Sequence, residues 1–292
     1  MSGTTGPRKP ASTRRTTPGR PLAARSVIAS ILLPLERPEL PGRSLVRCCE
    51  LFGIAEGTTR VALSRMVARR ELDQTGGIYR LTGSMLARQA RQRAGRWPQL
   101  REWDGRWIVA VVVAERRMAG DRAALRRVLL HNRLAELREG VWTRPDNVEG
   151  IGSVLVEPAA VAVGTVPLPL PTDHCTWWRA ELAADLGAPG DSALAARLWD
   201  LQGWADQARW MLDELDGTLP RLDGGDPSAL APCFAVAAAT VRHLTADPLL
   251  PSALLPARWP AGELRERYAT YEGAYRRVLA AWIRADDDAV VS

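Results

Sequence analysis

The chain of 292 residues is too long for one minimal core and suits two or three compact units, and its hydrophobic content of 46% excludes general disorder. Its longest apolar run, WIVAVVVA from Trp107, is too short to span a bilayer, and no apolar segment follows the basic N-terminus as in a secretory signal. The four cysteines are spaced too irregularly for a disulfide framework or a paired zinc motif. We therefore expect a cytoplasmic protein with reduced thiols, no metal and no cofactor.

The net charge of +6 conceals a division into a basic and an acidic part. Up to Arg101 there are 19 Lys and Arg residues against 6 Asp and Glu, a surplus of +13, and the remainder holds 20 against 27, a balance of −7. Because Lys9 is the one lysine in the chain, nearly every cation is a guanidinium, which suits phosphate and guanine. The first third is therefore expected to meet a polyanion.

The N-terminal third begins with a basic arm and continues with two helices. Residues 1–20 have no apolar periodicity, which predicts a disordered arm, either a solubilising tail or a segment that follows phosphates or a minor groove. Apolar residues at helical spacing predict one helix that ends before Pro34 and another from Pro41 to Phe52, with Gly53 at its C-cap.

The next segment, LFGIAEGTTRVALSRMVARREL, predicts a further helix with two different faces. One side of its helical wheel carries Thr59, Ala62, Leu63, Met66 and Val67, and the other carries Thr58, Val61, Ser64 and Arg65. A helix, a short turn and a second helix with a basic outer face are typical of a helix-turn-helix. ELDQTGGIYRLT then predicts a hairpin that turns at Gly76 and Gly77. Three helices followed by a hairpin predict a winged helix.

The outer face of this helix supplies the candidate DNA contacts, although a solvated arginine face is the simpler alternative. Arg60 or Arg65 suits bidentate contact with guanine, and Val61, an apolar residue in mid-face, suits a thymine methyl. Residues of the preceding helix and of the hairpin are expected to hold phosphates, which set register but not sequence. The full candidate set is Arg43, Arg47, Thr58, Thr59, Arg60, Val61, Ser64, Arg65, Tyr79 and Arg80. Thr59 is included although the wheel places it on the inner side.

The middle third predicts a small α+β unit. A polar helix over residues 83–95 leads to the buried strand WIVAVVVA, the helix GDRAALRRVLLHN and the strand GVWTRP, and SVLVEP and AVAVGTV look like two further strands. Strands and a helix in this order suggest a ferredoxin-like arrangement. The stretch PLPLPT, residues 167–172, predicts a stiff linker or an extended edge.

The last third is predicted to be helical. In LWDLQGWADQARWMLDEL, apolar residues alternate steps of three and four and form a narrow seam for packing against a partner helix. The seam consists of Leu198, Leu201, Ala205, Ala208, Leu212 and Leu215. An alanine-rich helix around residues 236–243 and a final helix over residues 262–284 follow, separated by the proline-punctuated DPLLPSALLPARWP.

These patterns predict a multidomain α+β protein with four parts. They are a disordered basic arm (1–20), a winged helix-turn-helix DNA-binding domain (21–95), a ferredoxin-like α+β middle domain (96–190) and a helical C-terminal domain (191–292).

Four separated motifs, in order, resemble the PaaX-like repressors, a family named for a regulator of phenylacetic acid degradation. They are LFGIAEGTTRVALSRMVARREL, the hairpin with YRLT, GVWTRP and DPLLPSALLPARWP, and the resemblance extends from about Pro21 to Trp282. It implies a winged-helix, ferredoxin-like and helical architecture. It also implies a dimeric repressor of a catabolic operon that releases operator DNA on binding an acyl-coenzyme A such as phenylacetyl-CoA. The chain departs from the family pattern at HNRLAELREGVW and between Val148 and Trp178.

An effector would bind in the middle part or in the adjacent acidic third. Aromatic side chains at Trp142, Trp177 and Trp178 are candidates for lining an aromatic pocket, with an ordinary core role as the alternative. The cations Arg116, Arg122 and Arg126 are candidates for meeting a coenzyme A phosphate, with a solvated surface as the alternative.

Three functions compete at this stage. The leading one is a homodimeric repressor whose paired reading helices dock in successive major grooves of an inverted repeat. An enzymatic alternative is a nuclease-like protein, because ferredoxin-like ribonucleases place an acidic residue after the first strand and Glu115 follows WIVAVVVA here. The third is an architectural DNA binder without an effector. No membrane partner is expected.

Overall fold

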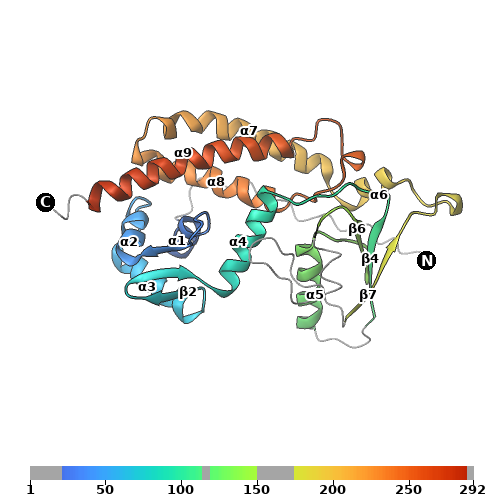
Figure 1. Cartoon of the computed structure of the whole chain (residues 1–292), viewed down its shortest axis with the longest axis horizontal. Coiled ribbons are helices and arrows are strands. Elements are labelled where there is room, and N and C mark those ends of the chain that lie inside the picture. The colour runs from blue at the N-terminus through green and yellow to red at the C-terminus, as the bar shows by residue number, and fades with distance from the viewer. Residues whose placement is uncertain (1–21, 114–118, 150–173, 288–292) are drawn as a thin grey trace, which may run out of the picture.

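The computed structural model describes residues 22–113, 119–149 and 174–287, and Figure 1 shows them as two small sheets bridged and flanked by helices. A mixed α+β class with a helical C-terminal region is thereby confirmed. Within these ranges, no helix combines the length and apolar character needed to cross a membrane. The basic arm, the two strands predicted within residues 153–166 and the linker at 167–172 lie outside the described residues.

The N-terminal part contains three helices and a three-stranded antiparallel sheet of order β1-β3-β2. Its elements are, in chain order, α1 (Ala24–Leu32), β1 (Glu39–Pro41), α2 (Gly42–Glu50), α3 (Glu56–Ala68), β2 (Leu72–Thr75) and β3 (Ile78–Leu81). The hairpin forms where the sequence predicts it. Gly76 and Gly77 have φ of +58° and +79°, as a two-residue turn requires. β1 was not predicted, because its prolines indicated a link, but Pro41 is tolerated on an edge strand.

The core of this part consists of the apolar stripes that helical spacing predicts. On α1 the buried stripe is Val27, Ile28, Ile31 and Leu32. On α2 the adjacent Cys48 and Cys49 are buried free thiols, so they serve as small core residues, as expected. Leu63 and Met66 of α3 complete the core from the third side. Burial of these side chains supplies the main free energy that holds the three helices together.

The middle part contains a four-stranded antiparallel sheet of order β5-β6-β4-β7 with one helix against it (Figure 1). Its elements are β4 (Trp107–Val112), α5 (Ala119–His131), β5 (Ala135–Arg138), β6 (Val141–Pro145) and β7 (Cys175–Ala180). The strands predicted from WIVAVVVA and GVWTRP are confirmed as β4 and β6, and they pair from Trp107 opposite Pro145 to Val111 opposite Val141. β7 was not predicted as a strand, although it pairs with β4 over six positions.

The helix α4 (Gly83–Arg96) joins the hairpin to the middle part, as Figure 1 shows. Its first half is anchored in the N-terminal core: Met85 is buried there, and the amide of Gln89 donates to the carbonyl oxygens of Leu33 and Leu35, both at 2.9 Å. Its second half packs against α8 (Leu230–Thr245), where Gly95 lies so close that a Cβ would stand 2.9 Å from the carbonyl oxygen of Leu244.

The C-terminal part is built on three packed helices, α7, α8 and α9. Its further elements are η1 (Ala184–Leu186), α6 (Asp191–Leu198), α7 (Leu201–Asp223), η2 (Pro227–Ala229), η3 (Ser252–Leu254) and α9 (Ala261–Asp287). The predicted seam is buried from Leu201 to Leu215. Ala208, Leu212 and Leu215 lie between these helices, whereas Leu201 packs in a separate cluster with Trp107. Leu198, however, ends α6, because the chain is extended at Trp199 and Asp200 caps a new helix by accepting from the Gly203 amide at 3.0 Å.

The long helix α9 ties the C-terminal part to the N-terminal one. Its last turns place Leu279, Trp282 and Ile283 against the N-terminal core. The guanidinium of Arg276 donates to the carbonyl of Pro34 at 2.6 Å. In Figure 1, α9 runs beside α7 and ends near α2. The three parts are therefore joined by α4 and α9 as well as by the chain itself.

Candidate nucleic-acid interface

The outer face of α3 is exposed. Leu63 and Met66 of α3 face the core, so the residues on the opposite side of the helix point outward. Val61 is half exposed, at 50%, in the middle of that face. The exposed candidates on α3 are Thr58, Arg60, Val61, Ser64 and Arg65. A rigid helix thus presents polar, cationic and apolar groups side by side.

The two cations of this face differ in their surroundings. Arg60 forms an ion pair with Glu56 one turn earlier, with 2.6 Å between Nη2 and the carboxylate oxygen. Arg65, by contrast, has no carboxylate partner among the described residues, so its guanidinium is the one ready to form a bidentate contact. The Ser64 hydroxyl donates to the carbonyl of Arg60 at 3.1 Å and still has its acceptor lone pairs.

Thr59 is not a groove-facing residue, and the prediction that included it is wrong. Its side chain is fully buried, at 0% exposure, on the side of α3 that faces the core. Its hydroxyl donates back to the carbonyl of Ala55 at 3.3 Å. The helical wheel places Thr59 on the inner side with Leu63 and Met66, and the structure agrees with the wheel rather than with the inclusion of Thr59 among the contacts.

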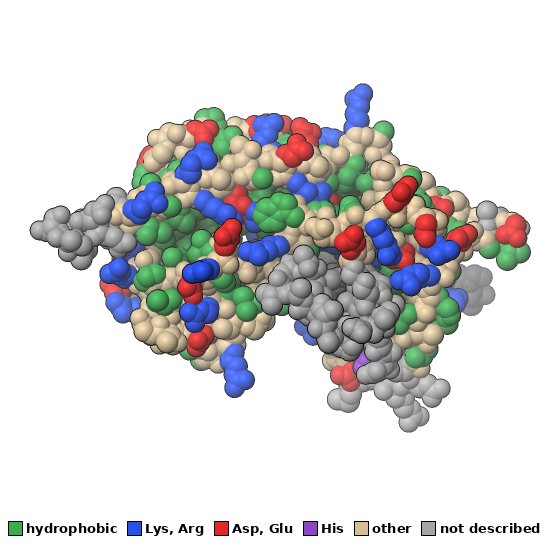
Figure 2. Space-filling view, in the orientation of Figure 1, with side chains coloured by type: hydrophobic (Ala, Val, Ile, Leu, Met, Phe, Trp, Pro, Cys, Tyr) green, Lys and Arg blue, Asp and Glu red, His purple; other side chains and the backbone are tan. Residues whose placement is uncertain are grey.

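Two of the predicted phosphate contacts already have partners within the protein. Arg80 lies on β3 between two carboxylates, 2.8 Å from Glu39 of β1 and 3.9 Å from Asp73 of β2, so its charge is already compensated. The guanidinium of Arg47 lies over the ring of Trp282 on α9, 4.6 Å from its centroid. Figure 2 shows arginine side chains on the N-terminal surface, interspersed with acidic ones.

On the rest of this surface, one predicted contact residue is packed against the fold and the other residues are accessible. Tyr79 is half buried, and its ring packs so close to Gly42 that a Cβ there would stand 2.9 Å from the ring carbon Cε2. Arg43, at the start of α2, is exposed. At the tip of the hairpin Ile78 is 40% exposed, a feature the sequence did not single out. Arg70, which follows α3, is exposed and has a φ of +54°.

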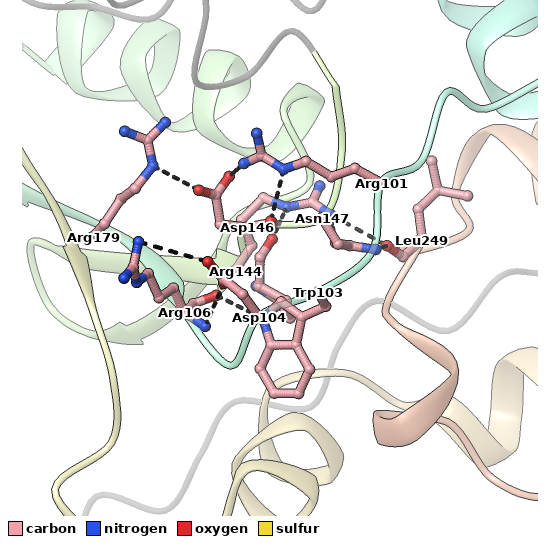
Figure 3. Close-up of polar contacts among 10 residues, drawn as sticks. Arg101, Trp103, Asp104, Arg106, Arg144, Asp146, Asn147, Arg179 and Leu249 are labelled. Atoms are coloured by element: carbon pink, nitrogen blue, oxygen red, sulfur yellow. Dashed lines mark hydrogen bonds and ion pairs between the residues drawn. The ribbon is translucent and has the colours of Figure 1, made fainter.

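A second polar cluster lies at the end of β6, and Figure 3 shows it in close-up. Arg144 is fully buried and donates to the carbonyl oxygens of Pro145 (3.0 Å), Asn132 (3.3 Å) and Leu249 (3.3 Å), and to the side-chain oxygen of Asn147 (3.0 Å). The Asn147 amide also donates to the carbonyl of Leu249. Burial, with the nearby charge of Arg133, lowers the pKa of Arg144 to about 9.

Near Arg144, the carboxylate of Asp146 forms ion pairs with two further arginines. Arg179 of β7 donates to it at 2.6 Å, and Arg101 pairs with its other oxygen (Figure 3). The cluster therefore fastens the sheet to the segment that contains Leu249. Two motifs that the sequence singled out, GVWTRP and DPLLPSALLPARWP, meet here, and their shared role is structural, because every donor of Arg144 that is placed points to a carbonyl or amide oxygen of the fold.

Three of the predicted effector residues, Trp142, Trp177 and Arg126, lie close to one another on one side of the sheet. Trp142 is buried in the core between the sheet and α5, which agrees with the ordinary core role given as its alternative. Arg126 lies over the Trp142 ring, 5.0 Å from its centroid, and pairs with Glu136. Trp177 is half buried, Trp178 is exposed on β7, and Arg122 is exposed on α5. Arg116 and Glu115 lie outside the described residues.

A cavity of about 320 Å³ opens elsewhere, where the end of α4, the end of α5 and residues 245–249 come together. None of the predicted effector residues lines it. Sequence reasoning missed it because its walls come from five segments that are separate in the chain. In the portions of the chain that the structure covers, no three His, Cys, Asp or Glu side chains are grouped to hold a metal ion.

Comparison with known proteins points to one family. Residues 23–85 match the family profile described as PaaX-like protein, and residues 199–285 match that described as PaaX-like protein C-terminal domain. Among solved structures, the uncharacterized protein Rv0674 from Mycobacterium tuberculosis is similar, with 35% identity and a TM-score of 0.64. That similarity covers 89% of this chain and 98% of the other. No curated protein matches.

Proposed function

The chain belongs to the PaaX-like family, and from this premise we propose that it is a transcriptional repressor that binds operator DNA through α3 and is released by a small-molecule effector. The family is regulatory rather than catalytic. The proposed effector is an aryl- or acyl-coenzyme A, and the regulated genes would form a catabolic operon. The proposed active form is a homodimer in the cytoplasm.

The proposed domain division follows the element order. Helices α1 to α3 with the β1-β3-β2 sheet have the order of a winged helix, in which α3 is the reading helix and the β2–β3 hairpin is the wing. The strand order β5-β6-β4-β7 with α5 after the first strand is that of a ferredoxin-like sheet. We assign residues 21–95, 96–190 and 191–292 to the three folded domains.

The observation that carries this proposal is the exposed face of α3. Val61 and Arg65 project from a helix whose opposite side is locked into a core, so the probe is rigid and its groups are accessible. An apolar group beside a guanidinium without a carboxylate partner suits the edge of a thymine next to a guanine in the major groove. Neighbouring cations would hold the phosphates on either side.

The experiment that tests the proposal is a footprint of the purified protein on the DNA upstream of its own gene. We expect a protected inverted repeat with half-sites about one helical turn apart, since two α3 helices of a dimer would enter successive major grooves. Addition of phenylacetyl-CoA and other acyl-CoAs would identify the compound that abolishes protection. Protection that is equal on every DNA fragment would contradict an operator-specific repressor.

A further inference from the structure

The cavity beside the buried arginine cluster has the size of a small-ligand site. Its volume of about 320 Å³ lies at the lower end of the range for such pockets, roughly 300–1,000 Å³. One wall comes from α4 and the residues after it, with Arg91 and Trp97. A second comes from the end of α5, with Leu130 and His131, and Trp199 also lines the space.

The segments that line the cavity are held in place by packing and hydrogen bonds, so their side chains cannot simply move together and fill it. Gly95 brings α4 into backbone contact with Leu244 of α8. The Arg265 side chain donates to the carbonyl of Gly95 at 3.0 Å and pairs with Asp247. Arg133 donates to the carbonyl oxygens of Thr245, at 3.0 Å, and of Asp247. The residues that shape the cavity are thus fixed by contacts with one another and with Gly95 and Arg265 behind them.

Arginines gather at the α4 wall, and one of them, Arg91, lines the cavity itself. Arg88 and Arg91 are half buried, one turn apart on α4, and Arg242 of α8 is close enough to act on Arg88. Burial lowers the pKa of Arg88, and the like charges of Arg25, Arg91 and Arg242 lower it further. Arg25 is paired with Glu71, but the other three guanidinium groups have no carboxylate partner within the described ranges.

His131 faces the same charge from α5. Burial lowers its pKa, and the positive charge of Arg91 is the next cause, so the imidazole is held in its neutral form. The acidic side chain of Glu149 also borders the cavity but is exposed to solvent. An anion between α4 and α5 would therefore meet the guanidinium of Arg91 in the cavity wall, with the charge of Arg88 one turn away on α4.

The rim of the cavity carries apolar side chains that the fold leaves uncovered. Trp97 is 53% exposed and lies on the guanidinium of Arg96, and Leu130 is 51% exposed. Trp199 is half buried and stacked on Trp107. Exposed large apolar groups around a hollow mark ligand sites more often than ordinary surface.

We propose that this cavity binds an organic anion, with its acidic group at Arg91 and its apolar part against Trp97 and Trp199. The proposal rests on the regulatory function proposed above, and it moves the effector site away from the sheet residues that the sequence suggested. The helix α4 connects the cavity to the part of the chain proposed to bind DNA. It begins two residues after the wing strand β3 ends, and its 14 residues span about 21 Å to the cavity.

The test is calorimetric titration of the full-length protein, without DNA, with phenylacetate, coenzyme A and phenylacetyl-CoA. Arg91→Gln removes the charge, Ala94→Phe fills the space, and Arg221→Gln is the matched control, an exposed arginine of α7 outside the cavity. We expect at least one probe to bind and both cavity variants to weaken it by about tenfold or more, with the control within about twofold. Ala94→Phe keeps the charge of Arg91, so weaker binding by this variant shows that the probe occupies the cavity and is not only attracted to its surface charge. If Ala94→Phe does not fold, Arg91→Gln alone tests the proposal.

The outcomes separate this proposal from the repressor function, because operator binding is measured on the same preparations. A wild-type protein that binds operator but none of the probes overturns the cavity proposal alone. Equal binding of a probe by the folded cavity variants and the wild type overturns it as well. So does an Arg91→Gln protein that loses operator affinity but keeps probe affinity, since Arg91 would then contact DNA. Probe binding that depends on the cavity, without any operator binding, supports the site and overturns the repressor function.

Discussion

At the scale of single residues, neighbours decide what each arginine can do. Arg60 and Arg65 lie on the same exposed face of α3, yet Arg60 is held by Glu56 and Arg65 is not paired within the described part of the chain. Arg144 is fully buried, and its guanidinium donates its hydrogen bonds to oxygens within the fold. Residue type and spacing predicted a reading helix, but they did not distinguish these roles.

The first prediction concerns Arg65. Arg65→Ala should lower affinity for the operator by about 1–3 kcal/mol and for random DNA by much less, because a bidentate contact with guanine would be lost. Binding is measured by gel shift on both DNAs. Arg209→Ala, on the exposed surface of α7, is the control and should leave both affinities unchanged. Equal losses on the two DNAs would reduce Arg65 to a phosphate contact.

The second prediction concerns Arg144. Arg144→Met should lower the free energy of unfolding by at least about 2 kcal/mol, because the carbonyl oxygens of Asn132 and Leu249 would lose a buried donor. Urea denaturation measures the change. Arg101→Met, which removes a more exposed partner of Asp146, should cost less. A larger loss for Arg101 would mean that the ion pairs, not the bonds of Arg144 to the backbone, hold the cluster.

At the scale of elements, α4 is the helix on which the arrangement depends. Its N-terminal half belongs to the core of α1 and its C-terminal half to the contact with α8. Periodicity predicted the helix at residues 83–95 almost to its observed ends, Gly83 and Arg96. What α4 touches was not predictable, because both contacts are made with segments remote in sequence.

Gly95 provides a test of that contact. Gly95→Ala should destabilise the protein by about 1–3 kcal/mol, since the new Cβ would overlap the backbone of Leu244 and Thr245. Gly217→Ala, inside α7 with open space around it, is the matched control and should stabilise by about 0.5–1 kcal/mol. Thermal unfolding of both variants measures the difference. Stabilisation by Gly95→Ala would show that α4 and α8 are less closely packed.

At the scale of the whole molecule, the basic N-terminal third and the acidic remainder are joined by two helices, α4 and α9. Arg47 and Trp282 form one of the contacts across that junction. If the basic part binds DNA as proposed, operator affinity should fall at least about a hundredfold between about 50 and 200 mM salt, because several phosphates are neutralised together. A series of gel shifts at increasing salt measures the slope. An affinity that is flat with salt would contradict docking in a groove.

The sequence by itself determined the local elements: the amphipathic helices, the Gly-Gly hairpin and the apolar strand from Trp107. Helical period, turn chemistry and β-branched runs act over a few residues and can be read without a fold. The tertiary structure alone decided the strands β1 and β7, the burial of Trp142 and Arg144, and the cavity at Arg91. These features depend on segments tens to hundreds of residues apart, and their contacts arise from how the whole chain packs.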